Sequence, residues 1–133
     1  MKKLYTLTFY DNFEERQEEF FIGVFELYDE AEGTAKKYLN NVPGFKDYHC
    51  KYDIKIKNVI DETDRLESVS IIRGWNSCND MNNYDIWESD LYADKSNAHT
   101  ALADIQKEII RQEWCIDTYK IGECHWCEGF VRI

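Results

Sequence analysis

The same order of hydrophobic patterns occurs twice along this 133-residue chain. Each copy has two segments of strand-like alternation, then a segment with apolar residues at helical spacing, then a third alternating segment. Several residues also match at a constant separation of 64 positions: Leu27-Tyr28 with Leu91-Tyr92, Ile22 with Ile86, and Asp53 with Asp117. We interpret the pattern as an internal duplication of a β-β-α-β unit.

Alternation of apolar and polar side chains predicts three strands in each copy. In the first copy these strands cover residues 4–10, 20–25 and 52–57, and a polar loop is expected over residues 11–19 because it contains four glutamates. In the second copy the predicted strands cover residues 69–75, 84–91 and 115–121.

Helical spacing of apolar residues predicts one helix in each copy. The first helix is expected to start at Asp29, because Asp29 and Glu32 have the spacing of a capping box. The second is expected from about Ser96 to Trp114, with Ala98 and Ile105 on its apolar face.

The predicted fold class is therefore α+β, with two tandem β-β-α-β units and antiparallel sheet whose helices pack on one face. We expect residues 1–133 to form a single compact domain, with residues 1–60 as the first unit and 67–133 as the second, which includes the tail. The two sheets are expected either to join edge to edge into one six-stranded sheet or to pack face to face; the first arrangement covers more strand edges.

Composition limits the possible partners. The formal charge of −10 argues against direct nucleic-acid binding and against binding to an anionic membrane, since both require Lys and Arg. The start of the chain has no apolar signal segment, and no run approaches the ~20 apolar residues of a membrane helix. With five cysteines and no export signal, we expect free thiols and a cytoplasmic location. A monomer and a homodimer are both compatible with the sequence.

Three short segments resemble a family of short, uncharacterised bacterial proteins. The segments are I-G-V-F at residues 22–25, P-G-F-K-D-Y at residues 43–48 and H-W-C-E-G-F at residues 125–130. The resemblance implies that a protein of that family consists of one β-β-α-β unit that ends in the closing motif. The match to this chain covers roughly residues 4–58 and 116–131. Here the closing motif follows only the second unit. The resemblance implies the fold and a bacterial or phage origin, and it implies no activity.

The segment Cys124-His125-Trp126-Cys127 is the strongest candidate for chemistry. A Cys-x-x-Cys pair supplies two zinc ligands, and His125 supplies a third donor. No second pair of this kind occurs, so the expectation is no cofactor, with zinc at Cys124, His125 and Cys127 as the alternative. The other interpretation of this segment is structural: His125 and Trp126 pack on the domain as part of the tail.

Motifs that would indicate an enzyme are missing from the sequence. It contains no glycine-rich phosphate loop, no H-E-x-x-H and no G-x-S-x-G. Carboxylates are so abundant that no acid/base pair stands out among them. We therefore expect this protein not to be an enzyme.

Aromatic and acidic residues in the second copy predict a protein-binding surface. Tyrosine and tryptophan are favoured at interface centres, and acidic surfaces accelerate association with basic partners. The predicted contact residues are Trp75, Asp80, Asp85, Trp87, Glu88 and Asp90. These features predict an interaction module and, within that class, an immunity or antitoxin-like protein that neutralises a basic toxin. The alternative is a small metal- or ligand-binding accessory protein that uses the Cys-His-Trp-Cys segment.

Overall fold

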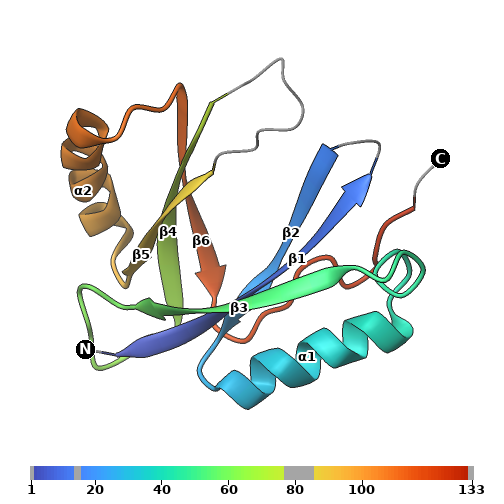
Figure 1. Ribbon diagram of the computed structural model, residues 1–133. Helices are drawn as coiled ribbons and strands as arrows, with labels where there is room; N and C mark the ends of the chain where they lie inside the picture. Colours follow the sequence, from blue (N-terminus) through green and yellow to red (C-terminus); the bar gives the residue numbers. More distant parts are fainter. Residues whose placement is uncertain (1, 14–15, 77–85, 132–133) are drawn as a thin grey trace. The chain divides into compact units, whose positions relative to one another are not determined.

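The computed structural model describes residues 2–13, 16–76 and 86–131. Their elements confirm the predicted α+β class with two β-β-α-β units (Figure 1). The elements are β1 (Lys3–Phe13), β2 (Arg16–Phe25), α1 (Tyr28–Asn41), β3 (Lys51–Asn58), β4 (Ser68–Trp75), β5 (Trp87–Tyr92), α2 (Lys95–Glu108) and β6 (Glu113–Lys120). Within these residues the strands form two three-stranded antiparallel sheets, ordered β2-β1-β3 and β5-β4-β6, and not one six-stranded sheet.

The chain forms two compact units, and the single compact domain over residues 1–133 stays a prediction. One comprises Leu4–Ile56 together with Ile121–Ile133, and we call it the split unit; the other comprises Met1–Lys3 and Lys57–Lys120, and we call it the inserted unit. The predicted division at residues 60 and 67 placed the tail with the second copy, whereas it belongs with the first. The physical reason is that the tail bonds to β2 and to the loop after α1.

In the split unit, α1 packs on one face of the sheet β2-β1-β3. Ala31, Ala35 and Tyr38 are the buried residues of this helix. They share a hydrophobic core with strand residues from the same sheet face, which are Leu7 and Phe9 of β1, Phe20 and Ile22 of β2, and the partly buried Tyr52 and Ile54 of β3. Apolar residues at helical spacing thus face apolar residues at strand spacing, as expected for a two-layer unit.

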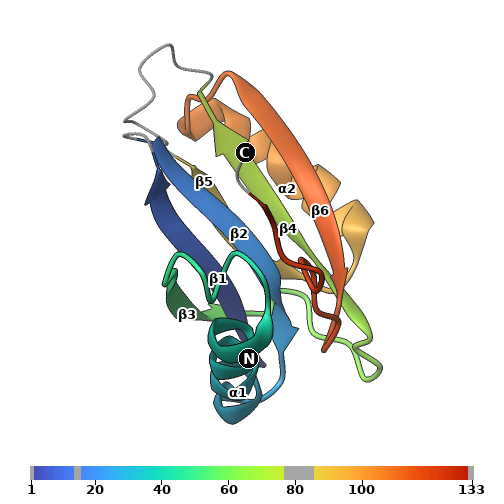
Figure 2. The ribbon, with the colours of Figure 1, turned by 90° about the vertical axis from the view of Figure 1, so that its right-hand side faces the viewer.

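In the inserted unit, α2 lies against one face of the sheet β5-β4-β6 and contacts all three strands (Figure 2). The buried residues of this core are Ile72, Tyr92 and Ala98, and partly buried aromatic and aliphatic side chains surround them, namely Trp87, Ala101, Leu102, Ile105, Trp114 and Ile116. Among the described residues, the cluster directly under α2 therefore consists mainly of partly buried side chains.

The structure repeats the predicted order but not the predicted separation of 64 residues. Leu27 is exposed at the start of α1, whereas Leu91 is buried in β5, so the two are not equivalent. The two helices start 67 residues apart, at Tyr28 and Lys95. At that separation Ala31 matches Ala98, and both are buried against their sheets. Burial, and not sequence identity, gives the correct alignment of the two copies.

The two helices begin differently, and the predicted capping box is wrong. α1 has Leu27 at its N-cap with no side-chain hydrogen bond, while Glu32 forms an ion pair of 2.9 Å with Lys36. Asp94 caps α2, because its carboxylate accepts a hydrogen bond of 2.9 Å from the amide of Ser96.

Strands β1 and β2 continue through the segment that we predicted as a polar loop. Backbone pairing extends through Asp11 with Glu18 to Phe13 with Arg16. Backbone hydrogen bonds do not depend on apolar side chains, so a hairpin can extend beyond the edge of its core.

α2 is shorter than predicted. It ends at Glu108, and Trp114 lies instead in β6, where its backbone pairs with Gly74 of β4. Trp114 and Ile116 therefore belong to the sheet and not to the helix, while Ile109 and Ile110 lie between the two elements. Within residues 2–13, 16–76 and 86–131, neither helix is both long and apolar enough to cross a membrane.

Candidate functional site

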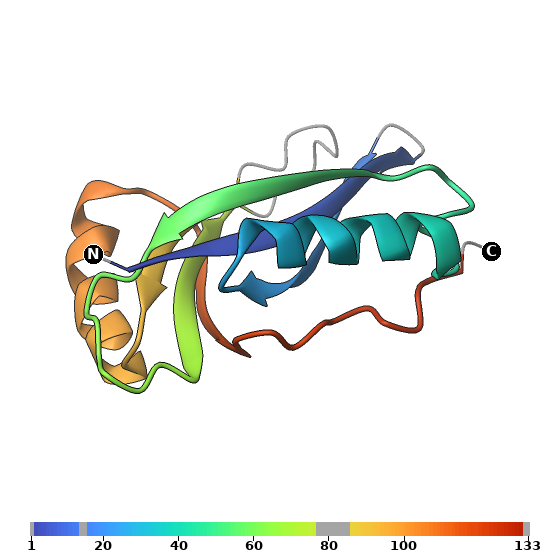
Figure 3. The same cartoon turned by 90° about the horizontal axis from the view of Figure 1, so that it is seen from below.

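The tail, residues 121–131, lies alongside α1 in the split unit (Figure 3). It also bonds to the edge strand β2 of the same unit. The amide of Gly122 donates a hydrogen bond of 2.7 Å to the carbonyl of Val24, and the amide of His125 donates one of 2.7 Å to the carbonyl of Ile22. These bonds cover part of a strand edge that would otherwise expose unpaired backbone groups.

Further along the tail, Phe130 contacts the loop after α1. Its amide donates a hydrogen bond of 3.1 Å to the carbonyl of Pro43. Its ring stacks on Phe20 with 4.6 Å between centroids and meets the edge of Phe45 at 5.1 Å. Trp126 approaches Phe20 edge-on at 4.9 Å. The I-G-V-F, P-G-F-K-D-Y and H-W-C-E-G-F segments therefore lie together in one unit.

The hydroxyl of Tyr38 connects α1 to the Cys-His-Trp-Cys segment. It donates a hydrogen bond of 2.8 Å to the carbonyl of His125, and its oxygen lies 3.5 Å from the sulfur of Cys127. The Cys127 thiol in turn donates to the carbonyl of Cys124 at 3.0 Å. Burial, and then the hydrogen bond with Cys127, raise the pKa of Tyr38, so the hydroxyl stays protonated.

The same segment was the predicted zinc site. Zinc binds thiolates, whereas burial and the neighbouring Cys127 raise the pKa of the Cys124 thiol above its ordinary value. Among the residues that the structure describes, no group of three or more His, Cys, Asp or Glu side chains is placed to hold a metal ion. Zinc at Cys124, His125 and Cys127 remains a prediction.

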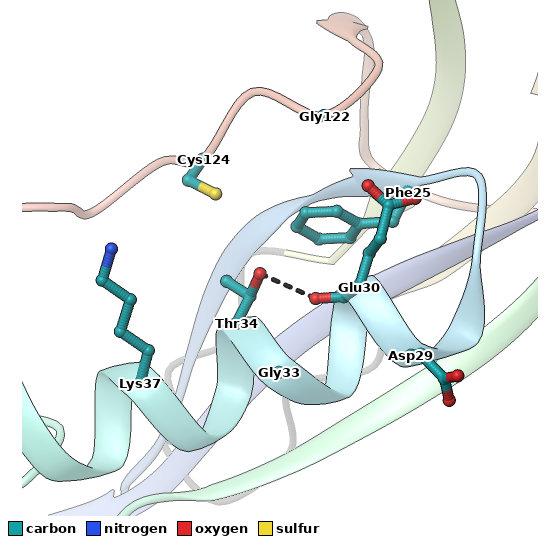
Figure 4. A pocket seen from close by; sticks show the side chains of 8 residues that line it. All are labelled: Phe25, Asp29, Glu30, Gly33, Thr34, Lys37, Gly122 and Cys124. Carbon is teal, nitrogen blue, oxygen red and sulfur yellow. Dashed lines mark hydrogen bonds between the residues drawn. The ribbon is translucent and has the colours of Figure 1, made fainter.

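A hollow of about 370 Å³ lies between α1 and the tail (Figure 4). Its lining residues are Phe25, Asp29, Glu30, Gly33, Thr34, Lys37, Gly122 and Cys124. The Phe25 side chain is buried, and the Thr34 hydroxyl bonds back to the carbonyl of Glu30 at 2.8 Å, which leaves it turned to its own helix. The hollow thus combines an aromatic wall, two carboxylates, one amine and one thiol.

Two of the predicted contact residues are engaged inside the inserted unit. Trp87 packs against the core under α2 and meets the ring of Trp114 at 5.8 Å. The carboxylate of Asp90 accepts a hydrogen bond of 3.2 Å from the amide of Asn58. Both side chains therefore have structural roles in their own unit.

A third predicted contact residue, Glu88, forms an ion pair with Arg73. The Arg73 side chain is only 13% exposed and bonds to Glu88 at 2.9 Å, to Asp117 at 2.7 Å and to the hydroxyl of Tyr119. Burial alone would lower the pKa of Arg73, but Tyr119 and Glu88 outweigh that effect and raise it. A buried cation of this kind needs its carboxylates for compensation, so Glu88 is not available to a partner without cost.

The other predicted contact residues are placed as follows. Trp75 is half-buried at the end of β4, where it pairs with Glu113 of β6. Asp80 and Asp85 lie outside the described residues. The structure thus brings Trp75, Trp87, Glu88 and Asp90 into one unit, with the last three turned to internal partners.

Sequence reasoning did not find the hollow. Its residues come from the end of β2, from α1 and from a tail more than 80 positions later, so no local motif contains them. One signal was present: Gly33 lies in the middle of a predicted helix, where glycine is unfavourable.

Comparison with protein-family models, with curated proteins and with solved structures found no match for this chain.

Proposed function

We propose that this protein is an acidic cytoplasmic interaction module that binds a basic protein partner, in the manner of an immunity or antitoxin-like protein that neutralises a toxin. The observation that carries the proposal is the charge of each unit. The split unit has 13 acidic and 7 basic residues, and the inserted unit has 13 and 9. Even complete internal pairing leaves an excess of six carboxylates in one unit and four in the other, which attract a basic partner.

The excess charge of the split unit is concentrated on α1 and the tail. This α1–tail surface is defined by its charged residues, which are Glu26, Asp29, Glu30, Glu32, Lys36, Lys37, Glu123 and Glu128. Its six carboxylates exceed its two lysines by four, out of the excess of six in the whole unit. All of these residues except Glu32 are exposed.

This surface fits a basic partner better than the predicted set on β5 does. Glu88 and Asp90 already have internal partners, and Trp87 contributes to a core. A partner that removed them from those contacts would have to compensate for the lost stability. Asp29 and Glu30 instead face solvent beside the hollow.

The cytoplasmic part of the proposal is supported by the cysteines. Among the described residues, Cys50, Cys115, Cys124 and Cys127 are free thiols. Free thiols are typical of a reducing compartment.

The test is a pull-down from host lysate with three versions of the full chain. One is the wild type, one carries D29N, E30Q and E123Q on the α1–tail surface, and one carries E62Q, D64N and E67Q on the inserted unit. Both variants lose three negative charges. We expect the wild type to retain a basic protein at low salt and release it at high salt, since screening weakens surface electrostatics.

The two variants separate the surface from the overall charge. Loss of the basic protein from the α1–tail variant alone supports the proposal, and restored toxicity on co-expression of that variant with the captured protein would identify a neutralising role. Equal loss from both variants would rule out the α1–tail surface as the specific site. If no version retains a basic protein, the proposed class of function is wrong.

The accessory-protein alternative is tested separately. Metal analysis of purified wild type and C124S shows whether zinc is present in stoichiometric amount and is lost with the thiol. Such a result would favour the alternative, because a structural thiol has no need of a metal.

A further inference from the structure

Gly33 gives the hollow its shape. It lies within α1, where glycine is less favourable than alanine. A Cβ atom built at Gly33 would meet no other atom within 4 Å, so no packing contact requires a glycine there. The lack of a side chain at Gly33 leaves open space at the wall of the hollow.

The walls of the hollow have two chemically different ends. Figure 4 shows the Glu30 side chain rising from α1 toward the tail, while the Lys37 amine lies at the opposite end, toward Cys124. Asp29 also lines the hollow, but Figure 4 shows its carboxylate turned away from the tail, so Glu30 is the carboxylate that faces the hollow. Asp29, together with Glu26 and Glu123, which neighbour lining residues in the sequence, makes the surroundings of the hollow net negative.

Between these ends lies an apolar and aromatic surface. The Phe25 ring belongs to the lining of the hollow, and the α1 residues that line it between Glu30 and Lys37 are Gly33 and Thr34. A long side chain with an apolar stem and a cationic end matches this arrangement, because its stem packs on the ring and its charge meets the carboxylates. The volume of about 370 Å³ lies at the lower end of the range for ligand pockets, which suits one side chain better than a large ligand.

We propose that this hollow receives one lysine or arginine side chain of the basic partner. The inference rests on the proposed function and specifies where the partner makes its central contact. An anchor side chain in a pocket, surrounded by weaker charged contacts, is the usual distribution of binding energy in an interface.

The probe for this inference is N-acetyl-arginine amide, titrated into the isotope-labelled full chain at low salt. We expect backbone amide shifts at Gly33, Thr34 and Gly122, with millimolar affinity, and none with N-acetyl-leucine amide. E30Q should weaken binding several-fold. K37Q should strengthen it, because the repulsive amine is gone.

The steric variant is G33Q, which fills the hollow without a change of charge. Glutamine is a better helix former than glycine, so this variant should fold at least as well as the wild type. A103Q, at an exposed position of α2 in the inserted unit, is the matched control. We expect G33Q to abolish the arginine-dependent shifts and A103Q to leave them unchanged.

Three results would overturn the inference: arginine shifts that persist in G33Q, the absence of shifts in the hollow of the wild type, or weaker binding of the arginine probe in K37Q, which would show that the carboxylates do not hold the cation against the Lys37 amine. These failures are distinct from a failure of the proposed function. If the basic protein of the pull-down binds G33Q as well as wild type but is lost from the α1–tail variant, the function stands and the hollow does not. If the probe occupies the hollow but no basic protein is retained, the hollow binds a cationic side chain and the proposed function is wrong.

Discussion

The hydroxyl of Tyr38 in α1 donates a hydrogen bond of 2.8 Å to the carbonyl of His125, which lies 87 residues further along the chain. The bond joins two parts of the split unit that are separated in sequence by the whole inserted unit. The split unit is therefore complete only when both ends of the chain have folded together.

Replacement of Tyr38 by phenylalanine should loosen the tail. The substitution removes the hydroxyl and leaves the partly buried carbonyl of His125 without this donor, which costs about 1–2 kcal/mol. Hydrogen exchange of the Gly122 and His125 amides, which bond to β2, should accelerate, while exchange in the inserted unit should not change. Y52F removes the same atom from half-buried Tyr52 of β3 and is the control. Equal acceleration in both variants would contradict a specific role for Tyr38.

Replacement of Gly129 by alanine should be more destabilising than replacement of Gly122. Both glycines have a left-handed backbone, with φ of +77° and +85°, and alanine in that region costs about 1–2 kcal/mol. A Cβ at Gly129 would also clash with the carbonyl oxygen of Pro43, whereas one at Gly122 would meet nothing within 4 Å. Urea unfolding should give a loss of about 1 kcal/mol for G122A and at least about twice that for G129A. Similar losses would show that the tail does not pass so close to Pro43.

The inserted unit should lose stability in acid partly through Asp61. Its carboxylate accepts hydrogen bonds from the amides of Ala93 and Asp94 and from the side chain of Asn97. Burial alone would raise the pKa of Asp61, but these bonds outweigh it and lower the pKa below its ordinary value. A lowered folded-state pKa contributes stability that is present above the unfolded-state pKa and is lost as the pH falls through the folded-state value.

D61N should therefore destabilise the inserted unit near neutral pH. Below about pH 4 the free energy of unfolding of this unit should fall less steeply with pH than in the wild type. Urea unfolding at several pH values, followed by resolved amide signals of α2, measures both effects. D64N, an exposed carboxylate of the same connector, serves as the control. An unchanged acid slope in D61N would show that Asp61 does not carry this dependence.

Periodicity predicted the order of elements because every strand and helix here has one face on a core. It could not predict the return of the tail to the first unit. That contact is made by irregular backbone at Gly122 and His125, and hydrogen bonds to a strand edge leave no period in the sequence. The separation of 64 residues was misleading for a related reason, since the identity of Leu27 with Leu91 relates an exposed residue to a buried one.

Trp87, Glu88 and Asp90 have partners inside the chain that charge alone does not reveal, and their role in partner binding stays a prediction. Glu88 lies on a strand opposite Arg73, and an arginine within the apolar run of β4 was the available signal. A cation in such a strand is buried and requires carboxylates nearby. Sequence reasoning that started from Arg73 would have assigned Glu88 to the fold and left the exposed carboxylates of α1 for binding.

Asp117 is the second carboxylate of that ion-pair group, and it should also control the reactivity of Cys115. The Cys115 thiol lies 3.4 Å from the Asp117 carboxylate, and burial together with that negative charge raises the pKa of Cys115 to about 11. The thiolate fraction near pH 8 is then about 100-fold below that of a thiol with the ordinary pKa of 9.0. Because a more basic thiolate is a better nucleophile by about tenfold, the alkylation rate should be about tenfold lower.

Alkylation at pH 8, followed residue by residue by mass spectrometry, should therefore be slower at half-buried Cys115 than at exposed Cys127. D117N removes the charge and should accelerate alkylation of Cys115 several-fold. E113Q removes a charge from an exposed position of the same strand and should leave the rate unchanged. Because D117N also weakens the group around Arg73, the folded fraction of the inserted unit is checked by the amide signals of α2, which belongs to the same unit. An unchanged rate at Cys115 in D117N would show that burial alone suppresses its reactivity.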